Sequence, residues 1–102
     1  MRILDDNKAE EILHIDLKGK SALADCMIIA TGRSNRHVTS LAEYVAQFLK
    51  PLSVDVRVEG KTNGDWVLVD NGDMVIHLFR PEVREFYKLD KIWLDHDATP
   101  AL

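Results

Sequence analysis

The sequence has 102 residues, of which 46% are hydrophobic, and this size and content suit one soluble domain with a single core. Its 17 acidic and 13 basic side chains give a net charge of −4, which argues against a broad basic face that would bind DNA or RNA. No apolar run approaches the roughly 20 residues needed to cross a bilayer, so we expect no membrane-spanning segment.

The single cysteine and the N-terminus bear on where the protein works. Cys26 has no second cysteine with which to form an internal disulfide, and this indicates a reducing compartment. The first residues show neither the apolar core of a signal peptide nor the Arg- and Ser-rich character of a transit peptide. We therefore expect a cytoplasmic protein whose residues 1–102 form one domain, with a short helical stub within residues 1–10 and a polar tail at residues 95–102.

The first elements predicted along the chain are a helical stub and two strands. Residues 6–10 suit the stub, and residues 12–17 form a β-compatible run that ends before Gly19. A second run, residues 26–30, ends at Thr31-Gly32. Because this run is apolar at successive positions, we expect a central strand that is covered on both faces.

The clearest helix begins after Ser34. Apolar side chains then recur at the i, i+3 and i+4 spacing of one helix face, at Val38, Leu41, Ala42, Val45, Phe48 and Leu49. Pro51 ends this pattern, since proline cannot continue the hydrogen bonds of a helix. Ser34 is a suitable N-cap because its hydroxyl can accept a hydrogen bond from an unpaired first-turn amide.

The second half of the chain predicts three strands and a helix. A half-exposed strand is indicated by alternation of charged residues with Val54, Val56 and Val58. Residues 66–70 and 74–79 flank Asn71-Gly72, a dipeptide that tolerates the positive φ angles of a tight hairpin turn. Pro81 suits the first turn of a helix that continues through Arg84, Phe86 and Tyr87. The whole order predicts an α/β (mixed α+β) fold with a mixed five-stranded sheet packed with helices.

The loop at residues 31–36 is the candidate for an enzymatic site. It joins a buried strand to a helix start, where free amides and the helix dipole can hold a phosphate, and Arg33 and Arg36 add positive charge. It has one glycine, whereas the Walker loop and the dinucleotide fingerprint need more. A small nucleotidyl- or phosphotransferase that uses this loop is the alternative function, beside a plain strand-to-helix turn.

Patterns for metals and nucleophiles are weak. The Asp-x-Asp at Asp95 and Asp97 lies in a polar tail and suits a solvated charge run, while Asp55 and Asp70 stand alone on their strands. No pair among His14, His37, His77 and His96 has the helix spacing of a zinc protease. A Cys26–His37 pair is disfavoured because a buried thiol is inert. We predict no catalytic residue, no metal and no cofactor.

Aromatic residues among acids characterise the second half of the chain. Large rigid side chains carry most interface energy, and complementary charge guides an encounter with a basic partner. The competing interpretation is that these aromatics are mostly core residues. The residues concerned are Trp66, Phe79, Phe86, Tyr87 and Trp93, which stand among Asp65, Asp70, Asp73 and Asp90.

Several segments along the chain form an ordered set of motifs. The opening segment is residues 24–32, followed by Ser34 and Arg36-His37-Val38. The later segments are Glu59-Gly60, residues 65–70, Gly72-Asp73, Val75-Ile76-His77, Arg84, Tyr87, Leu89 and Trp93. One such piece would be weak evidence, whereas the ordered set, over about residues 11–94, is specific. It resembles the signature of the ribosomal silencing factor (RsfS, iojap-related) family.

The resemblance implies a fold, a partner and a surface. It implies a nucleotidyltransferase-like fold without catalytic carboxylates, in a protein that is not an enzyme. It further implies binding to the large ribosomal subunit through ribosomal protein L-fourteen, a basic protein, which blocks the small subunit sterically and lowers translation when nutrients are scarce. The partner surface implied by the family lies on the sheet and the C-terminal half, with candidates Glu59, Trp66, Asp70, Asp73, His77, Tyr87 and Trp93. Arg36 and His37 belong to the signature but could equally hold the strand-to-helix turn.

The chain departs from the family pattern at two places. Only residues 1–10 precede the first strand, where the family usually has a longer helix, and Asp90 stands where a glutamate is common. A missing helix would expose apolar surface on the sheet, so we expect a homodimer that covers it. A dimerisation module without a ribosomal role is the third hypothesis.

Overall fold

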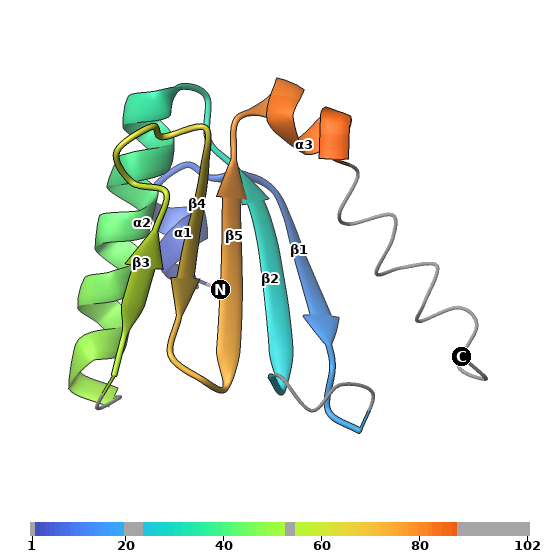
Figure 1. Ribbon diagram of the computed structural model, residues 1–102, viewed down its shortest axis with the longest axis vertical. Coiled ribbons are helices and arrows are strands. Elements are labelled where there is room, and N and C mark those ends of the chain that lie inside the picture. Colours follow the sequence, from blue (N-terminus) through green and yellow to red (C-terminus); the bar gives the residue numbers. More distant parts are fainter. Residues whose placement is uncertain (1, 20–23, 53–54, 88–102) are drawn as a thin grey trace.

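The computed structural model describes residues 2–19, 24–52 and 55–87, which form a sheet with helices packed on it (Figure 1). No helix among them is long and apolar enough to span a membrane. The elements in chain order are α1 Arg2–Asp6, β1 Glu10–Asp16, β2 Cys26–Thr31, α2 Asn35–Leu49, the 3-10 turn η1 Lys50–Leu52, β3 Arg57–Glu59, β4 Trp66–Asp70, β5 Met74–Phe79 and α3 Pro81–Tyr87.

The five strands form one mixed sheet in the order β1-β2-β5-β4-β3. β2 and β5 are parallel, and each of the other neighbouring pairs is antiparallel. This confirms the predicted mixed α/β fold and the antiparallel hairpin of β4 and β5. The parallel pair at the centre follows from the crossover through α2, since parallel neighbours need a long connection.

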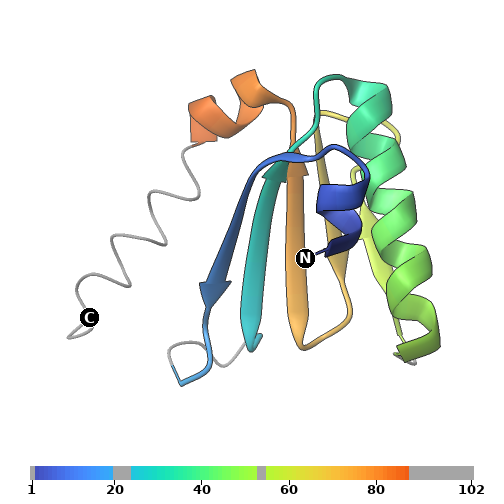
Figure 2. The ribbon, with the colours of Figure 1, turned by 180° about the vertical axis from the view of Figure 1, so that it is seen from behind.

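Both faces of the interior strand β2 are buried, as its unbroken apolar run predicts. Ile28 and Ala30 belong to the core beneath α1 and α2, whereas Met27 and Ile29 belong to a second cluster on the other side of the sheet. Figure 2 shows α1 and α2 together on one side, and we call that side the helix face. The opposite side, seen in Figure 1, is called the second face.

The stripe predicted for α2 faces the sheet with one exception. Ser34 caps the helix, and its Oγ accepts a hydrogen bond from the His37 amide at 3.1 Å, as predicted. Phe48 was expected in the stripe but is 48% exposed, whereas Ala46 is buried. The two residues lie at opposite flanks of the stripe, and a flank is buried only where a neighbouring element reaches it. Here β3 lies beside the Ala46 flank.

Three other details differ from the sequence prediction. The N-terminal helix is Arg2–Asp6 rather than residues 6–10, because Lys8 adopts a φ of 68° and the Ala9 amide bonds back to the Leu4 carbonyl, which turns the chain into β1. β3 is short, with Val56 before it, and Val54 lies outside the described residues. At the hairpin turn only Gly72 takes a positive φ, of 95°.

Candidate functional site

A shallow hollow of about 260 Å³ lies on the second face of the sheet. Five residues line it: Glu59, Gly60, Trp66, Leu68 and His77. The strand register explains part of this gathering, because Glu59 lies opposite Leu68 and Leu68 lies opposite His77. The hollow therefore brings together three of the seven predicted partner residues, namely Glu59, Trp66 and His77.

A hydrogen-bonded aromatic cluster forms one wall of this hollow. The indole Nε1–H of Trp66 donates to Nδ1 of His77 at 3.0 Å, which requires the imidazole to be unprotonated at that nitrogen. The Trp66 ring also stacks on Phe79, with centroids 4.8 Å apart and planes 29° from parallel. Phe79 itself is fully buried and so is a core residue.

Burial keeps this histidine neutral. It lowers the pKa of His77 from 6.5 to about 4, because a charged imidazolium loses hydration inside the sheet face. The ring therefore accepts a hydrogen bond from Trp66 at neutral pH and carries no charge there. The wall of the hollow is apolar in character, and Glu59 adds negative charge at the edge of the sheet.

The predicted acids Asp70 and Asp73 lie at the opposite end of the strands. Asp70 is four residues beyond Trp66, which is about 13 Å at the rise of a β-strand. Asp70 Oδ1 accepts the Gly72 amide at 2.7 Å and so holds the turn, whereas Asp73 is exposed. The structure therefore divides the predicted surface into an aromatic hollow and an acidic hairpin end.

Two further acids, Asp16 and Asp25, lie near the acidic hairpin end and were not among the predicted candidates. The Asp73 carbonyl accepts the Asp25 amide at 2.8 Å, which places the start of β2 beside the hairpin. Burial, with the charges of Asp16 and Asp25, raises the pKa of the Cys26 thiol. The sequence did not reveal this gathering because it depends on the register of β1 and β2, in which Asp16 lies opposite Cys26.

The hollow likewise contains two residues that were not singled out as candidates. Leu68 alternates with the neighbouring valines, and the period of two puts it on the same face as Trp66. Gly60 has a φ of 85°, and a side chain there would collide with the Trp66 carbonyl oxygen. The positive φ of Gly60 could not be predicted from the sequence, because the only sign of it there is the glycine itself. Leu68 could have been predicted as a residue of this face from the alternation of the strand.

The remaining candidates lie at α3 or beyond it. Tyr87 is the last residue of α3, and Trp93 lies outside the described residues. On the same helix, Phe86 is 79% exposed, in contrast to the buried Phe79. Among the aromatic residues whose side chains the structure describes, Phe79 is therefore in the core and Phe86 is at the surface.

The loop at residues 31–36 uses its polar groups to hold the strand-to-helix turn. The Gly32 amide donates to the Phe79 carbonyl, and the Arg33 amide donates to His37 Nδ1, each at 2.9 Å. His37 Nε2 lies 3.0 Å from the Asn7 carbonyl, so its proton ties the loop to the segment before β1. Gly32 packs so closely against Val38 that a side chain would collide with it. The Gly32, Arg33 and His37 amides, which a phosphate cradle could use, therefore already have structural partners.

Other candidate chemistry is not assembled in the part of the chain that the structure describes. Cys26 begins β2, whereas His37 follows the other end of that strand, so the strand's length of roughly 17 Å separates this candidate pair. No group of three or more His, Cys, Asp or Glu side chains among the described residues could hold a metal ion.

Comparison with known proteins identifies the family. The model for "Ribosomal silencing factor during starvation" matches residues 1–101. The chain is 53% identical to the ribosomal silencing factor RsfS of Zymomonas mobilis over 91 residues, which covers 88% of this chain and 68% of that protein. It is 38% identical to the RsfS of Haemophilus influenzae over 94 residues, covering 91% of this chain and 92% of the relative.

A eukaryotic relative and a solved structure extend this likeness. A mouse protein named "Mitochondrial assembly of ribosomal large subunit protein 1" is 37% identical over 95 residues, covering 89% of this chain and 42% of that protein. A crystal structure of a Chromobacterium violaceum protein superposes with a TM-score of 0.84 at 42% identity, covering 90% of this chain and 78% of that one. The chain belongs to the ribosomal silencing factor family.

Proposed function

We propose that this protein represses translation by binding the large ribosomal subunit through ribosomal protein L-fourteen and sterically blocking the small subunit. Membership of the ribosomal silencing factor family supports a role on the ribosome. The name of the mouse relative, which refers to the assembly of the ribosomal large subunit, favours the large subunit as the site of action. We expect the protein to act in the cytoplasm, when nutrients are scarce.

The observation that carries this proposal is the aromatic hollow on the second face. Trp66 is half-buried there, held by its bond to His77 and its stack on Phe79, so little conformational entropy remains to be lost on binding. Tryptophan anchors in such settings commonly supply much of an interface's energy. Glu59, which lines the hollow, and Asp73 at the hairpin end suit a basic partner in a chain whose net charge is −4.

The proposed mechanism needs binding alone. A protein that occupies a surface which the small subunit must contact will prevent joining when its affinity competes with subunit association. In this proposal Trp66 and Leu68 contribute apolar contact, His77 holds the indole in place, and the acids steer the encounter. In this mechanism no side chain forms or breaks a covalent bond.

Sucrose-gradient sedimentation tests the proposal directly. Purified protein is mixed with isolated large subunits, with small subunits, and with both at a magnesium concentration that permits joining. We expect the protein to migrate with large subunits only and to reduce the peak of joined ribosomes. Trp66→Ala is expected to lose at least about tenfold in affinity, since an anchor tryptophan is commonly worth 2 kcal/mol or more.

The control is Tyr44→Ala, which removes an exposed aromatic from α2 on the helix face. This variant should bind as the unmodified protein does. Migration with small subunits, or unchanged joining at saturating protein, would refute the proposed function. Equal loss of binding in both variants would refute the assignment to the aromatic hollow.

A further inference from the structure

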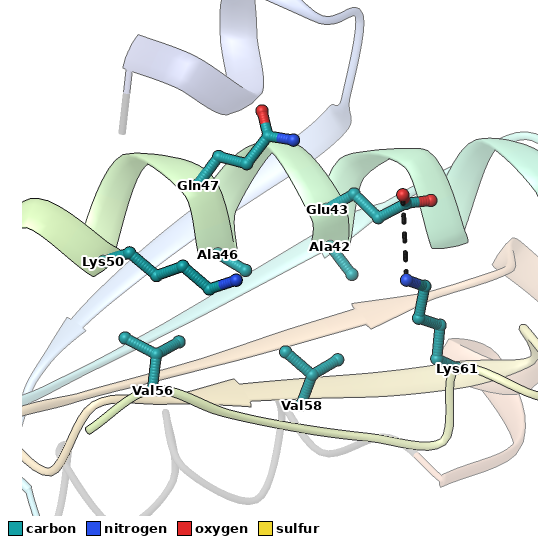
Figure 3. Close-up of a pocket in the computed structure, with 8 residues that line it drawn as sticks. All are labelled: Ala42, Glu43, Ala46, Gln47, Lys50, Val56, Val58 and Lys61. Atoms are coloured by element: carbon teal, nitrogen blue, oxygen red, sulfur yellow. Dashed lines mark ion pairs between the residues drawn. The ribbon is translucent and has the colours of Figure 1, made fainter.

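A second groove lies on the helix face, between α2 and the edge strand β3. Its volume is about 320 Å³, close to the lower limit of typical ligand sites. It is lined by Ala42, Glu43, Ala46, Gln47, Lys50, Val56, Val58 and Lys61 (Figure 3). The aromatic hollow lies on the opposite face of the sheet, so this groove is a separate surface.

The groove exists because α2 has small side chains on the side that faces β3, and these leave part of the space between the two elements unfilled. Ala42 and Ala46 are one turn apart on α2 and point toward β3, while Val56 and Val58 point back toward the helix (Figure 3). Two methyl groups cannot fill the space that larger residues would occupy there. Val58 therefore stays 36% exposed, which leaves apolar surface in contact with water.

A lysine lies at each end of this apolar floor. At one end Lys61 Nζ pairs with Glu43 Oε2 at 3.7 Å across the groove. At the other end the Lys50 side chain extends between Ala46 and Val56, and it has no ion pair within the described ranges 2–19, 24–52 and 55–87. The lining has two lysines and one glutamate, so it is locally positive in a chain whose net charge is −4.

The neighbouring backbone provides hydrogen-bonding groups as well. β3 is the last strand in the sheet order and, among the described strands, pairs with β4 alone, so alternate residues direct their amide and carbonyl groups outward. An extended peptide can pair with such an edge while its alternate side chains enter an adjacent groove. β3 has three residues, which limits this pairing to a short stretch and makes the groove decisive for affinity.

We propose that the groove docks an extended acidic segment of a partner protein. A carboxylate of that segment binds Lys50, and its small apolar side chains contact Ala46, Val56 and Val58. The segment runs alongside β3 on the helix face. Binding here leaves the second face free, so a partner in the groove and the partner of the aromatic hollow can be bound at once.

Charge and chemistry distinguish this occupant from other macromolecules. RNA binding needs several cationic contacts to phosphates, whereas the groove has a floor of alkyl groups and one lysine, Lys50, that has no ion pair with another described residue. A second copy of this chain is expected to dock on the exposed side chains Tyr44 and Phe48, which do not line this groove. An acidic segment with small aliphatic residues complements both the lysine and the floor.

Titration with short peptides tests the proposal on the full chain. The probes are fluorescein-labelled acetyl-Asp-X-Asp-X-Asp amides in which X is Ala, Val, Ile or Leu, and a matched set has Lys in place of Asp. Anisotropy gives the affinity, and ¹H–¹⁵N and methyl NMR spectra locate the peptide. Lys50→Glu is the disrupting variant, and Lys18→Glu, an exposed reversal elsewhere, is the matched control.

We expect saturable binding of at least one Asp peptide, with none of the Lys set binding. Lys50→Glu should weaken this binding at least about tenfold, whereas Lys18→Glu should leave it within about twofold. Shifted resonances should include the amides of β3 and the methyl groups of Ala42 and Ala46. The proposal is overturned by any of four results: no Asp peptide binds, the Lys set binds equally, Lys50→Glu has no effect, or the shifts map to Trp66 and His77. Competition by oligouridylate or self-association at the same groove would also overturn it.

Discussion

At the scale of single residues, the neutral state of His77 links the aromatic hollow to pH. Its pKa is about 4 in the folded protein against 6.5 when unperturbed, so the unfolded chain binds the proton more readily. The resulting stability is fully present above pH 6.5, is lost as the pH falls from 6.5 toward 4, and changes no further below 4. The size of the effect is about 3 kcal/mol.

The His77→Gln variant isolates this dependence, because glutamine can accept the Trp66 N–H bond and does not titrate. Urea unfolding of both proteins between pH 7.5 and pH 4 should show that the wild-type protein loses more stability than the variant. Parallel curves would mean that His77 is not responsible for the pH dependence.

Arg84 is the second residue whose environment leads to a prediction. It is 8% exposed, and its Nη1 donates to the Glu11 carbonyl at 2.7 Å and to Thr31 Oγ1 at 2.8 Å, joining α3 to β1 and β2. Arg84→Ala should lower the free energy of unfolding by about 3 kcal/mol, since hydrogen bonds from charged groups are lost and a buried hydroxyl is left unpaired.

Arg57→Ala is the control for loss of a guanidinium. Arg57 is exposed and its partner Asp55 lies 4.0 Å away, so its removal should change the free energy of unfolding by less than about 1 kcal/mol. Equal urea midpoints for the two variants would contradict the structural role of Arg84.

At the scale of elements, the turn between β3 and β4 sets the position of Trp66. Gly60 and Gly19 have nearly the same φ, 85° and 83°, but only at Gly60 would a side chain meet backbone, at the Trp66 carbonyl. Gly19→Ala should cost about 1 kcal/mol for the left-handed conformation alone. Gly60→Ala should destabilise the protein further and weaken binding to the large subunit, which thermal unfolding and sedimentation measure. Equal effects of the two substitutions would show that the close approach does not matter.

The β4–β5 hairpin leads to an electrostatic prediction. Asp73 is exposed at its end, and a charge at a rim acts mainly on the association rate. Asp73→Lys should slow association with the proposed partner, ribosomal protein L-fourteen, several-fold at low salt and little at high salt, as measured by surface plasmon resonance. Asp70→Lys should also loosen the turn, because Asp70 Oδ1 accepts the Gly72 amide, and so Asp70→Asn is the better test of its charge.

The matched control is Asp55→Lys, an exposed acid just before β3. If the acidic hairpin end guides the encounter with the partner, Asp55→Lys should change the association rate less than Asp73→Lys does. Identical rate changes would show that only the net charge matters.

At the scale of the whole molecule, self-association remains a prediction. Two aromatic side chains on the outer part of α2, Tyr44 and Phe48, are each nearly half exposed, and a homodimer would cover such surface. Sedimentation equilibrium should show a dimer that Phe48→Ser weakens at least about fivefold. Leu52→Ser, another exposed apolar residue near the end of α2, serves as the comparison. A monomer at all concentrations would refute this prediction.

Local features of the molecule could be predicted from the sequence because they depend on residues near in the chain. The Ser34 cap and the helix after it, the end of that helix before Pro51, and the β4–β5 hairpin each follow from spacing or from one residue's backbone preference. The ordered segments from residue 24 onward also indicated the family, which the comparisons confirmed.

Tertiary structure decided which distant residues meet. Glu59 joins Trp66 and His77 because β3, β4 and β5 pair in one register, whereas Asp70, on the same strand as Trp66, serves the turn at the other end. Burial of Phe79 and exposure of Phe48 depend on which element packs nearby, which periodicity cannot specify. The sequence by itself therefore determined most of the elements and the family. Only folding determined the hollow and the groove, since the hollow depends on the register of β3, β4 and β5 and the groove depends on how α2 packs beside β3.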